Sequence, residues 1–213
     1  MMKKIFMFFA AVSFLAVTSA NATEYGFDKA HSHIGFSVKH VLSMVPGEFK
    51  DYDGSFTFDE KKPEASKIKV TIQAASINTN VEMRDKHLKS DAFFDVEKFP
   101  TLAFVSKKVT AAGDKTYKAE GDLTIHGVTK SVVLDVEYMG TDTMMGMDTI
   151  GFSATTKIDR RDFGLVWGQD KLSGAGNLIV ANDVKINLDI AGLSKASMEK
   201  MKKMQKDKPA DKK

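Results

Sequence analysis

From residue 24 to residue 193, apolar side chains recur at every second position, and this period most constrains the fold. A period of two places successive side chains on opposite faces of a β-strand, so each run has one dry face and one wet face. The clearest runs are residues 34–40, 67–74, 131–138 and 184–190. Weaker strand candidates are residues 48–58, 101–110, 116–125 and 149–158. The chain is therefore predicted to be all-β.

Short links separate these runs. Turns are expected at Asp53-Gly54, at residues 112–114, at His126-Gly127 as a tight hairpin, and at Gly146. Short links favour antiparallel neighbours. Roughly eight antiparallel strands with one apolar face form a sandwich or a closed barrel, whose interior is filled by side chains or holds one ligand. Periodicity alone leaves that choice open.

The N-terminus has the pattern of a secretory signal peptide. A basic start at residues 1–4 precedes an uncharged apolar run at residues 5–17, and Ala20-Asn21-Ala22 fits a cleavage site. The run is too short to span a membrane, and no later segment is apolar enough to do so. We therefore predict a signal peptide at residues 1–22, a barrel domain at residues 23–194 and a periplasmic protein, with an extracellular location as the alternative.

Charge and cysteine content exclude several classes of function. The formal net charge is +3, but residues 195–213 hold eight Lys against three acids, so the body is acidic and offers no basic patch for nucleic acid. The chain has no Cys, which excludes thiol redox chemistry and thiolate metal sites.

The basic tail, residues 195–213, is predicted to start as a helix over residues 195–206. Met198, Met201 and Met204 lie at helical spacing within it. Two interpretations remain open, a solvated and frayed end or a transient contact with an anionic membrane surface.

One helix is predicted to interrupt the strands, over residues 80–89. Thr79 and Glu82 have the spacing of a capping box. Arg84, Asp85 and His87 lie on this helix, and together they could suggest catalysis. No nucleophile accompanies them, so a solvated face with local ion pairs is favoured over a catalytic site.

Two other clusters were weighed as binding sites. His31 and His33 would face the same way on a strand, as a metal pair would, but no third ligand is evident and no metal is predicted. The segment 159–164, which contains Arg160 and Arg161, could grip a phosphate or carboxylate. We favour a corner that Asp and Arg side chains tie to the backbone and that ends at Gly164.

Several motifs occur together, in one order, across nearly the whole body. They are residues 28–36, His40, and residues 47–49, 76–79, 84–95, 99–100, 121–130 and 158–164. In these the chain resembles the YceI-like family of bacterial exported polyisoprenoid-binding proteins. The basic tail and the Met144-Met145-Gly146-Met147 loop depart from the family pattern.

The resemblance implies a lipocalin-like, eight-stranded antiparallel β-barrel, to which the sequence adds one short helix between strands and a C-terminal helical tail. It implies a non-enzymatic carrier with a polyisoprenoid, an isoprenoid-quinone-like lipid or another long-chain amphiphile in its cavity, and no required cofactor. Burial of a prenyl tail needs no chemistry, since each CH₂ removed from water contributes about 0.8 kcal/mol. An enzyme that acts on such a lipid, or a ligand-free structural module, is the alternative, and homodimerisation is left open.

The predicted ligand site has two parts. Arg84, Asp85 and His87 are expected to hold the helix in place or to meet a polar head group. The predicted cavity wall consists of Phe36, Val38, Phe49, Phe56, Leu88, Phe93, Phe94, Phe104, Ile125 and Phe152.

Overall fold

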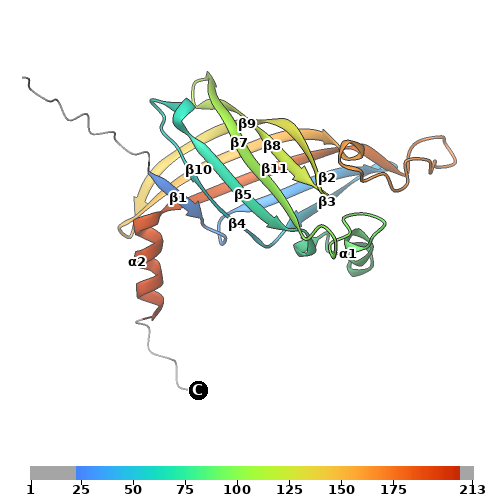
Figure 1. Ribbon diagram of the computed structural model, residues 1–213, viewed down its shortest axis with the longest axis horizontal. Coiled ribbons are helices and arrows are strands. Elements are labelled where there is room, and N and C mark those ends of the chain that lie inside the picture. Colours follow the sequence, from blue (N-terminus) through green and yellow to red (C-terminus); the bar gives the residue numbers. More distant parts are fainter. Residues whose placement is uncertain (1–22, 207–213) are drawn as a thin grey trace, which may run out of the picture.

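The computed structural model describes residues 23–206. The predicted signal peptide and the last seven residues of the tail lie outside this range. Figure 1 shows one barrel, with the helix α1 (Glu82–Lys89) near one end and the helix α2 (Lys195–Lys206) at the other. Neither described helix is long and apolar enough to cross a membrane.

The described residues form eleven antiparallel strands that occupy eight positions around the barrel. Their bounds are β1 (Glu24–Phe27), β2 (His33–His40), β3 (Ser43–Phe49), β4 (Tyr52–Thr57), β5 (Lys67–Gln73), β6 (Ile77–Asn78), β7 (Thr101–Gly113), β8 (Thr116–Ile125), β9 (Val128–Met144), β10 (Met147–Asp159) and β11 (Val180–Ser194). Three short 3-10 helices link them, η1 (Pro63–Ala65), η2 (Ala74–Ser76) and η3 (Arg160–Phe163). The predicted fold class, an eight-stranded antiparallel barrel, is confirmed.

Three positions in the ring are made of two strands each. β1 and β2 both pair with β11, and β4 and β3 pair with β1 and β2 respectively. β6 extends the position of β5 by pairing with β3. At the break between β1 and β2, the Ser32 hydroxyl donates to the Ala191 carbonyl and accepts from the Ala191 N–H, both at 3.0 Å. These bonds hold the bend between β1 and β2 to β11, and the pairing of β1 with β11 closes the ring.

The two ends of the barrel carry different connections. The end near α1, called the mouth, also carries the hairpins β2–β3 and β8–β9, η3 and the loop of residues 164–179. The end near α2, called the base, carries the hairpins β7–β8 and β9–β10 and η1. At the mouth, His126 and Gly127 form the predicted two-residue hairpin, with both φ angles positive as a type I′ turn requires.

Three sequence predictions about the fold were incomplete or wrong. β1 and the β2–β3 hairpin were not predicted, because β1 is short and the hairpin contains Pro46 and Gly47. The predicted turn at Asp53-Gly54 is wrong, since both residues lie inside β4. Gly54 has a φ of +155°, and a Cβ there would collide with the Lys69 carbonyl oxygen of β5. This glycine permits close backbone approach and does not mark a turn.

Candidate ligand-binding cavity

The interior of the barrel holds a cavity of about 410 Å³ with an almost wholly apolar wall. Alternate residues of the long strands point into it. From β9 these are Val132, Leu134 and Val136, whereas Val133 between them is exposed. Alternation of this kind follows from the strand pleat. The volume and the wall are typical of a site for a small apolar or amphiphilic molecule.

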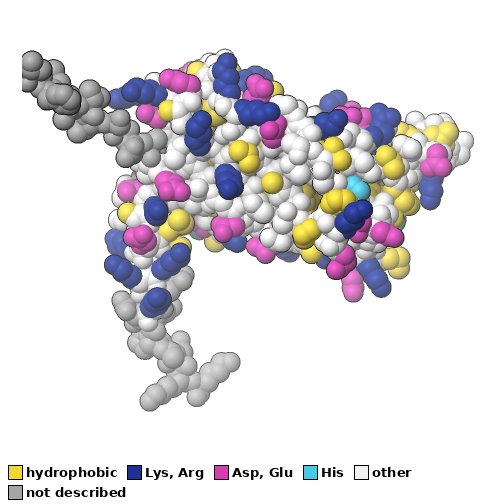
Figure 2. All heavy atoms as spheres, viewed as in Figure 1, with side chains coloured by type: hydrophobic (Ala, Val, Ile, Leu, Met, Phe, Trp, Pro, Cys, Tyr) yellow, Lys and Arg dark blue, Asp and Glu magenta, His cyan; other side chains and the backbone are white. Residues whose placement is uncertain are grey.

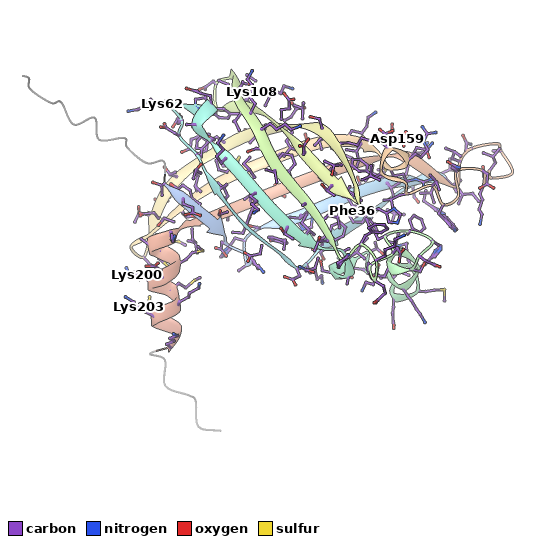
Figure 3. The ribbon with its side chains drawn as sticks, in the orientation of Figure 1. Phe36, Lys62, Lys108, Asp159, Lys200 and Lys203 are labelled. Atoms are coloured by element: carbon purple, nitrogen blue, oxygen red, sulfur yellow. The ribbon has the colours of Figure 1, made fainter. Side chains whose placement is uncertain are left out.

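The structure brings the predicted wall residues together. All ten lie in the cavity wall, where they come from seven different elements or from the chain between α1 and β7. Figure 3 labels Phe36, which lies near the mouth, toward α1. Arg84 and His87 also reach the wall, whereas Asp85 does not. Contact of these residues with a ligand stays a prediction.

The polar and charged groups of the wall gather mainly at the mouth. Arg84, His87, Arg160 and His40 all come from elements at this end. Among the described residues that line the cavity there is no Asp or Glu. The cavity is therefore amphipathic along its length, with basic groups at the mouth and an apolar body.

An aromatic cluster stands at the mouth and joins two distant segments. The His87 ring lies edge-on to Phe93 and to Trp167, with ring centroids 5.2 and 4.9 Å away, and Phe93 lies 5.3 Å from Trp167. The Lys171 ammonium lies over the Trp167 ring at 4.5 Å from its centroid. Such contacts each contribute about 0.5–1.5 kcal/mol. They hold the loop 164–179 against α1 beside the opening.

The start of α1 differs from the prediction, because polar side chains of the helix bind Thr79 and no side chain caps the helix. The capping-box prediction is wrong, because α1 starts at Glu82 after Val81, and no side chain caps it. Asn80 adopts a left-handed φ of +59°, which separates Thr79 from the helix. The Thr79 hydroxyl instead accepts a bond from Arg84 Nε at 2.8 Å and donates to the Asp85 carboxylate.

This network fixes Arg84 at the edge of the cavity. Arg84 Nη2 also donates to the Thr79 carbonyl at 2.8 Å, while the Asp85 carboxylate accepts from the Thr79 N–H at 2.8 Å. The Asp85 carboxylate therefore positions α1 by binding Thr79. It does not line the cavity. Among the described residues, the Arg84 Nη1 group has no hydrogen-bond acceptor, and the Arg84 side chain lines the cavity.

The segment 159–164 forms the predicted corner. The Asp159 carboxylate accepts from the Arg161 N–H at 2.9 Å and from the Arg161 guanidinium, and Gly164 ends η3 with a left-handed φ of +77°. These donated bonds hold the pKa of Asp159 below its usual value. Arg160 points inward instead. Burial lowers its pKa, and its guanidinium donates to the carbonyl groups of Leu165 and Ala181 at 2.5 and 3.1 Å.

Aromatic rings fill the barrel toward the base. We call the cluster of Phe56, Phe58, Tyr117, Tyr138 and Phe152 the aromatic plug. Phe58 is at its centre, with ring centroids 5.2 Å from Tyr117, 5.0 Å from Tyr138 and 5.0 Å from Phe152. Burial raises the pKa of Tyr117 above its usual value. The plug gives the cavity an uncharged floor.

Sequence reasoning missed three groups of wall residues. The inward faces of β9 and β11 follow from the same alternation that predicted these strands, so Val136, Ile186 and Leu188 could have been included. Arg160 was considered with Arg161 as an anion-binding pair and then assigned to a corner, and was not predicted in the cavity wall. Trp167 gave no signal, because it lies in an irregular loop beside Gly168 and its position depends on contacts with α1.

The two histidines weighed as a metal pair have carboxylate partners. His31 Nδ1 lies 2.7 Å from Asp28 Oδ2, and His33 Nδ1 lies 3.4 Å from Glu48 Oε2. His31 precedes β2, so the two imidazoles do not share a strand. Within residues 23–206 no group of three or more His, Asp or Glu side chains is arranged to hold a metal ion.

Comparison with known proteins gives a consistent result. The model of the YceI-like domain matches residues 25–192. The protein YceI of Salmonella arizonae is 42% identical over 185 residues, which is 84% of this chain and 96% of that protein.

Two solved structures share the fold. The crystal structure of the Campylobacter jejuni YceI protein is 38% identical with a TM-score of 0.64, over 79% of this chain and 96% of that one. A polyisoprenoid-binding domain from Saccharophagus degradans matches with a TM-score of 0.60 over 82% of this chain and 99% of that one, but at 13% identity it shows the fold alone. The matched domain spans nearly the whole barrel, and the chain belongs to the YceI-like family.

Proposed function

We propose that this protein binds one long-chain amphiphile, a polyisoprenoid or isoprenoid-quinone-like lipid, inside the barrel and carries it through the periplasm. The observation that carries the proposal is the cavity itself, which is apolar along its body and basic at its mouth. The Saccharophagus degradans domain of the same fold is described as polyisoprenoid-binding, and our proposal extends that ligand class to this chain.

The arrangement of polar groups supports one orientation of that ligand. A polar head would lie at the mouth, where the guanidinium of Arg84 and the ring of His87 could donate to its oxygen atoms. The chain would extend toward the aromatic plug. Burial of each CH₂ contributes about 0.8 kcal/mol, so the tail supplies most of the affinity and the head supplies direction.

An enzymatic role is not proposed. Arg84 and Asp85 are both hydrogen-bonded to Thr79, and the His87 ring packs edge-on against Phe93 and Trp167. No hydroxyl among the described residues is hydrogen-bonded to the His87 ring as a nucleophile would be. The cavity also favours a binding protein over a structural module whose barrel is filled by side chains.

Periplasmic location is proposed from the N-terminal sequence pattern and family membership.

The test of lipid binding begins with the protein purified from the periplasmic fraction of its own source. Organic extraction followed by mass spectrometry should release about one equivalent of a long-chain lipid, because a deep apolar cavity retains such a ligand during purification. Purified protein without lipid, which also binds no prenyl quinone in titration, would contradict the proposal.

A further inference from the structure

The base of the barrel carries a second candidate surface, outside the cavity. It consists of α2 and the tip of the β9–β10 hairpin, with the residues Met144, Met145, Met201, Met204, Lys200, Lys202, Lys203 and Lys206. We call it the base surface. Lys200 Nζ donates to the Gly146 carbonyl at 3.2 Å, which places the helix and the hairpin tip side by side.

The first turn of α2 is fixed to the barrel. The Ser197 hydroxyl accepts from the Asp148 N–H of β10 at 2.8 Å, and Ser197 is buried. Met198 lies over Gly26 of β1, in space that a side chain at Gly26 would need. Lys195 lies 3.7 Å from the Glu24 carboxylate. The helix is therefore held in a defined direction.

Beyond this anchored turn, α2 projects away from the barrel (Figure 1), so its last two turns cover no core. Its twelve residues span about 18 Å. Met204, three residues after the half-buried Met201, is 61% exposed. At the hairpin tip Met144 is 61% exposed and Met145 is 84% exposed. Large exposed apolar side chains that cluster on two neighbouring elements are typical of an interaction surface.

The charge on the projecting part of the helix has one sign. Residues 200–206 hold four Lys and no acid. Figure 2 shows lysine side chains along this helix with apolar side chains near its attachment. Methionines flanked by lysines match an anionic bilayer, since apolar side chains enter the acyl boundary while each Lys gains about 1 kcal/mol from anionic lipid.

We propose that the base surface docks reversibly on an anionic lipid bilayer. The methionines of α2 and the hairpin tip enter the interface, and Lys200, Lys202, Lys203 and Lys206 contact the head groups. Because the mouth is at the opposite end of the barrel (Figure 1), the docked protein presents its mouth away from that bilayer. The cavity then exchanges ligand with a partner or an opposing membrane while the base stays in contact.

The experiment is co-sedimentation of the mature protein with phosphatidylglycerol–phosphatidylethanolamine vesicles and with uncharged phosphatidylcholine vesicles, at low and physiological salt. We expect binding to the anionic vesicles only, weakened by salt. The double variant Lys200→Gln/Lys203→Gln should lower the partition coefficient about thirtyfold. Glutamine keeps the helix propensity, and unchanged circular dichroism and ligand titration show that the barrel is intact.

The matched control is Lys39→Gln/Lys130→Gln, which removes the same charge from exposed lysines of β2 and β9 near the mouth, at the opposite end of the barrel. It should change the partition coefficient less than twofold. Met145→Asn/Met204→Gln, which removes apolar area without a change in charge, should weaken binding severalfold.

Four results would overturn the proposal. The first is no binding to vesicles, and the second is equal binding to anionic and uncharged vesicles. The third is a control variant that loses as much binding as Lys200→Gln/Lys203→Gln. The fourth is tighter binding to a DNA duplex than to anionic vesicles. None of these results affects the cavity, so a failure here is distinct from a failure of the proposed lipid binding.

Discussion

The mouth and the base of the barrel are both aromatic, but their rings have different surroundings. At the base, Phe56, Phe58 and Phe152 pack on one another and on tyrosines within the barrel. At the mouth, Phe93 packs on His87 and Trp167, beside an exposed loop. At the base the rings pack on other rings inside the barrel, whereas at the mouth they join a helix to an irregular segment. The comparison leads us to expect that substitutions at the base cost more stability than substitutions at the mouth.

The largest expected effect is on the free energy of unfolding when one Phe at each end of the barrel is replaced by Ala. Phe56→Ala should lower the free energy of unfolding by about 3–5 kcal/mol, because Phe56 is 6% exposed and stacks on Tyr25. Phe94→Ala at the mouth, where the ring is half-buried, should cost about 1–2 kcal/mol. Urea unfolding measures both. Equal losses would show that the mouth is part of the structural core.

The second effect concerns the cavity between the two ends. Ala154→Phe places a ring in the cavity and should weaken phylloquinone binding about 100-fold or more, since the ligand must share the space. Thr155→Phe adds the same ring at the next, outward-facing position of β10 and is the control. Titration calorimetry measures both affinities. A ligand that binds both variants equally binds outside the barrel.

A third variant tests the chemistry of the mouth. Arg84→Met keeps the bulk of the side chain and removes its donors, so phylloquinone, which has carbonyl oxygens, should bind about tenfold more weakly. Squalene, a hydrocarbon without a head group, should bind with unchanged affinity. Weaker binding of both ligands by the same factor would mean that Arg84 acts only by holding α1 on Thr79.

The smallest effect concerns the corner at the mouth. The pKa of Asp159 is lowered by the bonds it accepts from Arg161, so its charge stabilises the fold at neutral pH. That contribution is lost as the pH falls through the lowered folded pKa. Asp159→Asn should therefore cost about 0.5–1 kcal/mol at pH 7, and the difference from wild type should shrink below about pH 4.

Exposed Asp91→Asn is the control for the corner, and urea unfolding across the pH range checks both. A difference at Asp159 that persists unchanged at low pH would contradict the electrostatic origin of this stabilisation.

The long strands of the barrel were largely predictable from the sequence, and the contacts between distant segments at the mouth were not. Strand alternation depends on local sterics and on burial of one face, so it predicted β8 at residues 116–125 and the inward direction of Phe152. Residues such as Arg84 and His87 were identified as candidates, but their partners were not. Thr79 was expected to cap α1 and instead binds Arg84, because Asn80 turns the chain between them.

Long-range contacts explain the remaining differences. Trp167 contacts His87, which is eighty residues away in the sequence, and no local sequence pattern predicts that contact. Gly54 looked like a turn because its residue type is common in turns, whereas its function depends on β5 lying against it. When the role of a residue depends on a strand or helix distant in the sequence, the residues next to it in the chain do not predict that role.

Trp167 offers the most direct test of the central claim, because it is the only tryptophan in the chain and lies at the mouth. Two prenyl alcohols that carry bromine beside the hydroxyl or at the far end of the chain would be titrated while Trp167 fluorescence is recorded. With the head at the mouth and the tail toward the aromatic plug, the head-labelled lipid should quench strongly and saturably, and the tail-labelled lipid weakly. Equal quenching, stronger quenching by the tail label, or no saturable quenching would contradict this account.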